Sequence, residues 1–138
     1  MTVDGNPIRT AIREKLLAST GLTNLLSEPD AVYYQLGPSG AELPYVVFQE
    51  QADGAPLWTM EGPPLETVAW LVKATGTVEE AENIHIEIRK VLDRAELTIQ
   101  GHDSLYCQRQ SSVAYPETDN GQRFQHVGSV YRITTKEQ

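Results

Sequence analysis

The stretch ETVAWLVKATGTVEEAENIHIEIRKVL, residues 66–92, decides the fold of this chain. In its first part, 66–75, Val68, Trp70 and Val72 share one face, and apolar residues also occupy the other face. A strand that is apolar on both faces is typical of a central position in a covered sheet. The pattern therefore predicts a central strand over 66–75, with the Trp70 side chain in the core.

A helix is predicted directly after this strand. Thr77 is a suitable N-cap, and Glu80 three residues later completes the pattern of a capping box. Basic residues near the other end, among them Arg94, match the negative end of the helix dipole. One buried face is predicted from apolar residues at helical spacing, which are Ala81, Ile84, Ile88, Val91 and Leu92.

Further elements are predicted on either side of this strand and helix. Asn6 and Pro7 have the composition of a helix start, and the segment 116–121 has that of a turn. Gly128 interrupts the alternation of the last strand, which predicts a bulge or a sharp bend there. The expected elements are a helix from Asn6 to Gly21, a helical turn over Leu22–Leu26, and strands over Ala31–Gln35, Leu43–Gln49, Ser104–Tyr115 and Arg123–Thr134.

Together these elements predict a single α+β domain over residues 1–138. The length of 138 residues is close to the commonest domain size, roughly 100–150 residues. The last two strands should pair as an antiparallel hairpin. We expect an antiparallel or mixed sheet of about four to five strands, with two main helices packed on one face. The segment 52–65, which carries two glycines and three prolines, is predicted to be a long loop.

The charge of the chain bears on its partners. It carries 19 acidic and 11 basic residues, which gives a formal net charge of −8. Neutralising nucleic-acid phosphates requires clustered Lys and Arg, whereas the basic residues here are scattered, so specific binding to nucleic acid is not expected. Two interpretations of the acidity stay open. It is either a solvated surface that resists precipitation, or a wall that repels DNA and lets it slide past.

Cysteine usage and hydropathy bear on the compartment. Cys107 is the only cysteine, so an internal disulfide cannot form. The segment MTVDGNP at residues 1–7 lacks the apolar run of a signal peptide, and no apolar stretch approaches the roughly 20 residues that span a bilayer. We therefore expect a protein that is kept in a reducing cytoplasm, or in a particle assembled there, without membrane contact.

The histidines and the cysteine, which could act in catalysis or metal binding, have no second ligand or catalytic group at a suitable spacing in this sequence. His85 has no second ligand at helical spacing, and His102 lies in a predicted Gly-His-Asp turn without convergent groups. His126 is interpreted as a surface residue or a hydrogen-bonded sheet histidine, and Cys107 as a small buried hydrophobe. No catalytic, cofactor-binding or metal-binding residue is predicted, so we expect a protein that is not an enzyme and holds no cofactor.

The loop 52–65 carries the candidate for a protein contact. Leu57, Trp58 and Met60 place large apolar side chains between glycines and prolines. Trp and Met are enriched at the contact surfaces of proteins. The alternative is that Trp58 folds back as a lid on the core, and the sequence pattern favours neither interpretation.

Several short strings occur along the chain in an order that resembles a known family. They are the helix Ile8–Leu26, Val32-Tyr33-Tyr34, Leu43–Phe48, Val68–Thr75, Glu79-Glu80-Ala81-Glu82, Ile88–Asp93 and Val130-Tyr131-Arg132-Ile133. In this order they resemble the small tail completion, or tail terminator, proteins of long-tailed bacteriophages. The resemblance covers nearly the whole chain.

The resemblance implies an α+β structural protein that performs no chemistry. Members of that family form a ring, commonly a hexamer, that caps the tail tube, stops its polymerisation and presents a surface to the head–tail connector. The implied partners are further copies of the chain, the tail tube protein and the connector protein, while DNA only passes through the lumen. The implied location is the tail or neck of the virion, assembled in the host cytoplasm, with the loop 52–65 touching the tube or a neighbouring subunit.

Two other interpretations stay open at this point. A head-side joining protein of the neck would be found in the same particle but at another position. A small-molecule-binding or enzymatic α+β domain would need a concave pocket with converging polar groups. A pocket with His102 or His126 and a carboxylate at its wall would favour that last interpretation.

Overall fold

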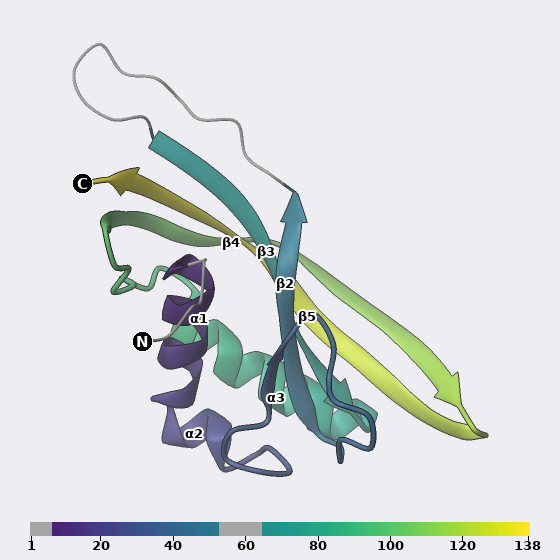
Figure 1. Ribbon diagram of the computed structural model, residues 1–138. Helices are drawn as coiled ribbons and strands as arrows, with labels where there is room; N and C mark the ends of the chain where they lie inside the picture. Colours follow the sequence, from purple (N-terminus) through teal and green to yellow (C-terminus); the bar gives the residue numbers. More distant parts are fainter. Residues whose placement is uncertain (1–6, 53–64) are drawn as a thin grey trace.

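A mixed sheet organises the part of the chain that the computed structural model describes, residues 7–52 and 65–138 (Figure 1). Its strands are β1 (Val32–Tyr34), β2 (Tyr45–Ala52), β3 (Leu65–Gly76), β4 (His102–Asp119) and β5 (Gln122–Glu137). They follow the order β1-β2-β3-β5-β4, with β1 parallel to β2 and the other neighbours antiparallel. The predicted α+β class with a mixed sheet is confirmed.

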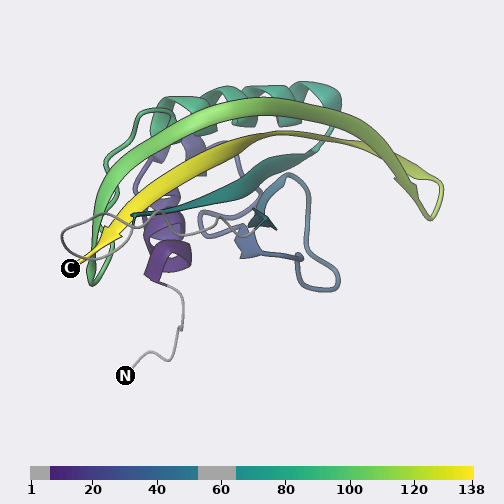
Figure 2. The same cartoon turned by 90° about the horizontal axis from the view of Figure 1, so that it is seen from above.

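The helices lie on one face of this sheet, as Figures 1 and 2 show. They are α1 (Pro7–Leu17), the short α2 (Thr20–Thr23) and α3 (Val78–Leu92). α3 packs across β3 and β5, while α1 packs against α3 and β1. Ile12 of α1 and Ile88 of α3 are fully buried in the core between helices and sheet. The described helices leave the opposite face of the sheet uncovered.

β3 is the central strand that the sequence predicts. It pairs with β2 on one side and with β5 on the other. Val68, Trp70 and Val72 belong to the core beneath the helices, and Trp70 is 1% exposed. The Trp70 ring lies 6.1 Å from the Phe48 ring on β2, measured between centroids. The predicted core position of Trp70 is confirmed.

The start of α3 is the capping box that the sequence predicts. The Glu80 amide donates a hydrogen bond to the Thr77 hydroxyl at 3.2 Å, and the Thr77 amide donates one to the Glu80 carboxylate at 3.0 Å. These bonds satisfy amide groups that a helix start otherwise leaves without partners. Because the cap follows β3 directly at Gly76, the helix folds back over the sheet without an intervening loop.

The N-terminal helical segment differs from the prediction in where it breaks. α1 ends at Leu17 rather than at Gly21. Ser19 caps a separate turn of helix, because its hydroxyl accepts a hydrogen bond from the Leu22 amide at 3.2 Å. Gly21 therefore lies inside α2, and the helical turn expected over 22–26 starts earlier in the chain than predicted.

The hairpin of β4 and β5 is longer than the sequence predicts. The turn expected over 116–121 consists only of Asn120 and Gly121, whose φ angles are 51° and 77°. Positive φ at both central residues is the requirement of a type I′ turn, which prefers the sequence Asn-Gly. Pro116 lies within β4 instead of the turn, and the sheet tolerates it because β4 is an edge strand.

Of the two alternatives predicted at Gly128, a bulge or a sharp bend, the bulge is wrong. β5 pairs past Gly128 without a register shift, opposite Lys73 on one side and Val113 on the other. Close packing requires the glycine instead, because a Cβ atom there would lie 2.5 Å from the Val72 carbonyl oxygen and 2.6 Å from the Lys73 Cα atom. The register shifts of this hairpin lie in β4, between Ser104 and Tyr106 and between Arg109 and Ser111.

Candidate functional site

Two predictions concern residues that the structure does not describe. One is the helix cap at Asn6. The other is the contact loop 52–65 with Leu57, Trp58 and Met60, of which residues 53–64 lie outside the described part of the chain. Both stay predictions, and the candidate site is built from the described residues alone.

Cys107 lies in the core on β4, where it is 1% exposed. Burial, together with the nearby charge of Asp93, raises the pKa of the thiol to about 12. The thiolate is the nucleophilic form of cysteine, and a thiol with this pKa stays protonated at neutral pH. Cys107 therefore packs as a small apolar side chain, as interpreted from the sequence.

His102 lies at the start of β4 and not in the predicted turn. Gly101 turns the chain with a φ of 79°, but His102 and Asp103 already pair with β5. The His102 Nδ1 atom lies 3.2 Å from the Gln100 carbonyl oxygen. Among the described side chains, no group of three or more His, Cys, Asp or Glu residues could hold a metal ion.

His126 lies on the sheet face that the described helices leave uncovered, where it is 6% exposed. Its ring stacks on Tyr115 at a centroid distance of 4.6 Å, and Phe124 approaches it edge-on at 5.6 Å. Nδ1 lies 3.1 Å from the Thr75 hydroxyl. Nε2 lies 3.5 Å from the Glu117 carboxylate, which is an electrostatic contact rather than a hydrogen bond. His126 is thus a buried sheet histidine, and the surface interpretation is wrong.

The environment of His126 opposes its protonation. Burial lowers the pKa of His126, and the positive charge of Lys73 lowers it further, while Glu117 acts in the opposite direction. Burial is also the main cause that lowers the pKa of His85 on α3, and two nearby arginines add to it. Both folded-state pKa values therefore lie below the usual value of about 6.5.

The two histidines should make stability depend on pH. Below about pH 6.5 the unfolded chain binds protons that the folded histidines resist, so the free energy of unfolding should fall as the pH is lowered further. The stabilising contribution is fully present above that pH. Urea unfolding at pH 7.5 and 5.5 measures this loss of unfolding free energy. The His126→Gln variant should lose less unfolding free energy between these pH values than the wild type does. An equal loss in both proteins would show that His126 does not contribute.

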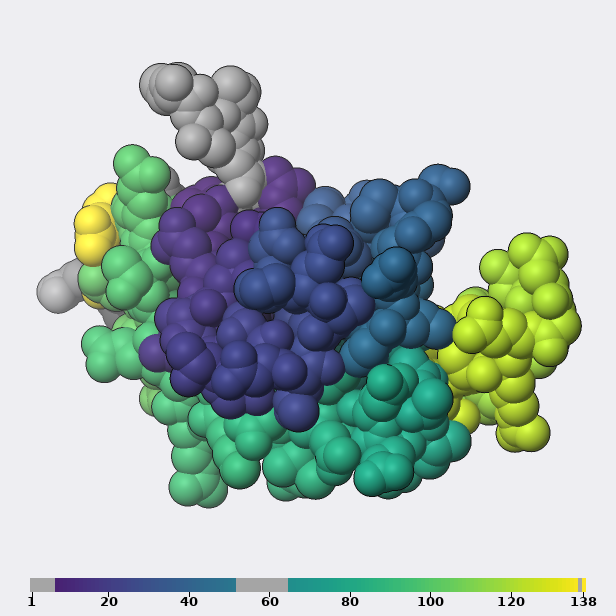
Figure 3. Space-filling model, turned by 90° about the horizontal axis from the view of Figure 1, so that it is seen from below, coloured from purple at the N-terminus to yellow at the C-terminus, as the bar shows by residue number. Residues whose placement is uncertain are grey.

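The hairpin ends in a two-stranded arm, residues 117–124. Pairing between β3 and β5 stops at Gly76 and Gln125, so beyond that point β4 and β5 have only each other as sheet partners. Figures 1 and 3 show this tip projecting from the body of the molecule. A two-stranded hairpin has marginal stability in water without further packing. Contact with another molecule would therefore stabilise the arm.

A hollow of about 650 Å³ lies between the arm and the loop 38–43, which precedes β2. We call this hollow the notch. Tyr45 and Phe124 contribute aromatic rings to its lining, and its charged lining residues, Glu42 and Asp119, are both acidic. In Figure 3 the loop and the arm form two lobes with a gap between them. Carboxylates beside aromatic rings form a setting that suits a cation.

Sequence reasoning missed the arm and the notch. The Asn120-Gly121 pair was a sufficient signal for the arm, because a type I′ turn centred there sets the register of both strands. That register places Tyr115 opposite His126 and would have predicted their stacking. No comparable signal exists for the notch, because its two sides come from segments far apart in the sequence.

The chain matches a known family over residues 10–136. The family model is described as tail completion protein gp17. Its members are structural proteins of the bacteriophage tail, which places this fold in the class of virion proteins. The chain belongs to the tail completion protein gp17 family, and the resemblance predicted from the sequence is confirmed.

The fold also matches a solved structure. One chain of a particle described as "Virion of native gene transfer agent (GTA) particle" aligns with a TM-score of 0.77 and 16% sequence identity, over 98% of each chain. At this identity the likeness establishes the shared fold. No curated protein matches the chain in sequence. No helix in the described part of the chain is long and apolar enough to cross a membrane.

Proposed function

We propose that this protein forms a ring, of six copies as in the family it resembles, that caps the tail tube. The ring would end tail polymerisation and present the attachment surface for the head–tail connector. The family match over residues 10–136 carries the proposal. The partners would be further copies of the chain, the tail tube protein and the connector protein. On this proposal the protein works by shape and contact, and it is not an enzyme.

Features of the described surface support an assembling protein. The described helices leave one face of the sheet uncovered, and the arm projects with two strands only. Leu36 is 82% exposed and Tyr106 is 60% exposed, although both side chains are large and apolar or aromatic. A ring arises when different surfaces of identical subunits meet and the rotation between neighbours closes. Such a contact would cover surfaces that the isolated chain leaves in water.

Two finer parts of the proposal rest on the sequence. The loop 52–65, with Leu57, Trp58 and Met60, would contact the tube or a neighbouring subunit, because Trp and Met are favoured at protein contacts. The net charge of −8 would let DNA pass through the lumen without adhering, since phosphates are repelled by an acidic wall. DNA would therefore be in transit and not a bound ligand.

Assembly without this protein tests the proposed function. Particles should be produced from a genome in which the gene carries an early stop codon, and tail lengths measured by electron microscopy. We expect tails of irregular, excessive length without attached heads, with normal particles restored by the wild-type gene supplied in trans. Tails of normal length that merely lack heads would contradict a role in ending the tail, and would favour a head-side joining protein instead.

A further inference from the structure

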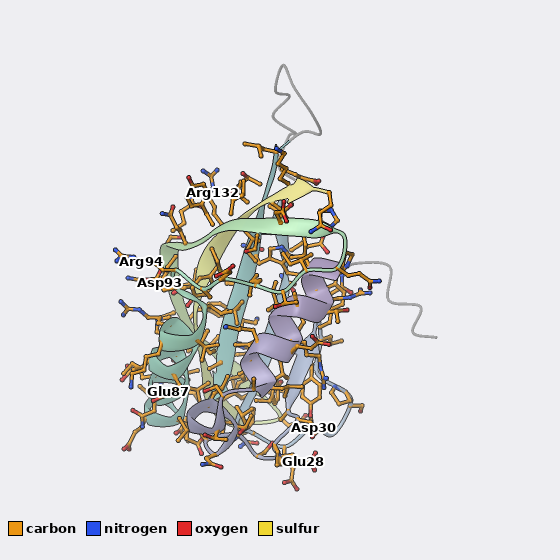
Figure 4. The ribbon with its side chains drawn as sticks, turned by 90° about the vertical axis from the view of Figure 1, so that its left-hand side faces the viewer. Glu28, Asp30, Glu87, Asp93, Arg94 and Arg132 are labelled. Atoms are coloured by element: carbon orange, nitrogen blue, oxygen red, sulfur yellow. The ribbon has the colours of Figure 1, made fainter. Side chains whose placement is uncertain are left out.

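β4 forms one edge of the sheet and pairs with β5 alone. The chain that follows α3 covers the first part of its outer edge. The Arg94 amide donates a hydrogen bond to the Cys107 carbonyl oxygen at 2.7 Å. The Arg109 amide donates one to the Asp93 carboxylate at 3.1 Å, and Asp93 and Arg94 lie together at the end of α3 in Figure 4. Beyond Arg109, residues 111–119 have no strand on their outer side among the described residues, and we call them the free edge.

Backbone groups point outward at every second residue of the free edge. The two-residue turn makes Asp119 and Gln122 a hydrogen-bonded pair, and the register does not shift between there and Ser111. The residues whose backbone groups point away from β5 are therefore Ser112, Ala114, Pro116 and Thr118. Proline, which has no amide to donate, suits such an outward position. A row of unpaired backbone groups of this kind is a template for pairing with another strand.

The opposite edge strand is protected, whereas the free edge is not. β1 has three residues and packs against α1. The Arg13 Nε atom donates a hydrogen bond to the Val32 carbonyl oxygen at 3.2 Å. Edge strands that avoid pairing are commonly short, covered or charged. The free edge is exposed except at the half-buried Val113, and its first six residues, SSVAYP at 111–116, carry no charge.

We propose that the free edges of two copies pair antiparallel about a twofold axis at Tyr115. The cap by Asp93 bounds the free edge at one end and the turn bounds it at the other, and Tyr115 is the midpoint of residues 111–119. With Tyr115 opposite the same residue of the second copy, the whole free edge is paired and the pairing stops before the cap. In this register Ser112 lies opposite Thr118 of the second copy, so outward backbone groups meet each other.

The side chains suit this register. Glu117 would lie opposite Val113 of the second copy, and Asp119 opposite Ser111, so no two carboxylates are directly opposed. The two Tyr115 rings would form an aromatic cross-strand pair, which stabilises antiparallel strands. Tyr115 is 40% exposed, and its hydroxyl accepts a hydrogen bond from the Lys73 amine at 2.7 Å. The ring is therefore held in place and still has surface to offer.

The pairing would also stabilise the arm. Residues 117–119 belong to the arm, where β4 has only β5 beside it. A strand from the second copy adds the third strand that an isolated hairpin lacks. Because the axis is twofold, the arms of both copies gain this strand, whereas a strand from another protein would support one arm. This reciprocity favours a second copy as the partner.

This contact differs in kind from the contact of a ring. A contact between like surfaces closes after two copies, while a ring repeats a contact between unlike surfaces. The pairing therefore does not depend on the proposed ring, and we expect it in the free protein as a symmetric dimer.

Thr118→Pro tests the backbone hydrogen bonds of the dimer. It removes an outward amide and leaves the ladder with β5 intact, as the native Pro116 does. Thr118→Val is the matched control, because it keeps the amide. We expect analytical ultracentrifugation to show Thr118→Pro dimerising at least about tenfold more weakly than the wild type, since the twofold axis removes two hydrogen bonds at once. Thr118→Val should stay within about threefold of the wild type. Thermal unfolding verifies that each protein is folded.

Cysteine cross-linking tests the register. Residues directly opposite in antiparallel strands have Cβ atoms about 4.5–5.5 Å apart, so Tyr115→Cys should form a disulfide between two copies under mild oxidation with copper phenanthroline. Val113→Cys is the control, because the twofold axis at Tyr115 separates the two Val113 positions by roughly 13 Å along the strands. The wild type, whose Cys107 is buried, gives the background.

A wild type that stays monomeric at the highest concentration reached would overturn the pairing, and so would equal dimerisation of Thr118→Pro and the wild type. Cross-linking of Val113→Cys as fast as Tyr115→Cys would overturn the register. The proposed ring has a separate outcome, because Thr118→Pro should still form rings at tube ends. Dimers without rings would reject the ring alone, and rings without dimers would reject the pairing alone.

Discussion

Trp70→Ala is expected to lower the free energy of unfolding by about 3–5 kcal/mol, the usual cost of removing a large aromatic side chain from a core. Trp70 is 1% exposed at the centre of the sheet and lies against Phe48 of β2 and Tyr34 of β1. The truncation would leave a cavity between the sheet and the helices. Because the flanking strands are paired on both sides, the site has little freedom to collapse. Urea unfolding followed by circular dichroism measures the loss.

Trp70→Phe is the matched control for that variant. The Trp70 Nε1 atom has no hydrogen-bond partner in the described structure, so phenylalanine removes volume without breaking a polar contact. We expect it to cost less than half as much as alanine. A loss below about 1 kcal/mol for Trp70→Ala would place Trp70 outside the core and contradict the fold as described.

Gly128→Ala is expected to destabilise the protein by about 2–3 kcal/mol, although it adds a single methyl group. The new Cβ atom would meet the Val72 carbonyl oxygen at 2.5 Å and the Lys73 Cα atom at 2.6 Å. Both contacts are with the backbone of the adjacent strand, so relief requires β3 and β5 to move apart. Overpacking of this kind typically costs about 1–3 kcal/mol. The midpoint of urea unfolding measures the effect.

Gly37→Ala controls for the chemical change itself. A Cβ atom at Gly37 would lie 3.4 Å from the Tyr45 ring, which is a tolerable contact with a side chain. We expect this variant to stay within about 1 kcal/mol of the wild type, since surface loop substitutions of this size are usually small. Equal losses at both glycines would refute the close approach of strands at Gly128.

The central strand and α3 could be predicted because their signals are local. The apolar faces around Trp70 and the pairing of Thr77 with Glu80 both lie within a few residues of sequence, and both were found as expected. The α+β class follows once these two elements are fixed. A strand covered on one face by a helix requires further strands at its sides.

The errors in the fold arise where two signals compete or where the deciding neighbour is distant. Gly21 was expected to end a helix, but the Ser19 hydroxyl offers a cap two residues earlier and starts α2. Pro116 was assigned to a turn, whereas its place on an edge strand removes the penalty for its missing amide. Gly128 was expected at a bulge or a sharp bend, but the reason for a glycine there is the close approach of the β3 backbone, which sequence spacing does not show.

The candidate site was less accessible to sequence reasoning than the fold. The notch joins the loop 38–43 to the arm. This juxtaposition arises only after the sheet has formed. Cys107 could be assessed from the sequence, and in the structure it packs in the core. The burial of His126 could not, because it depends on Tyr115 of the neighbouring strand.

Electron microscopy of the purified protein, alone and mixed with purified tail tubes, tests the central claim most directly. The account predicts closed rings of uniform copy number, coaxial with the tube and seated at a tube end, after which added tube protein no longer lengthens that end. A protein that stays monomeric and leaves tube ends bare and able to grow would contradict it.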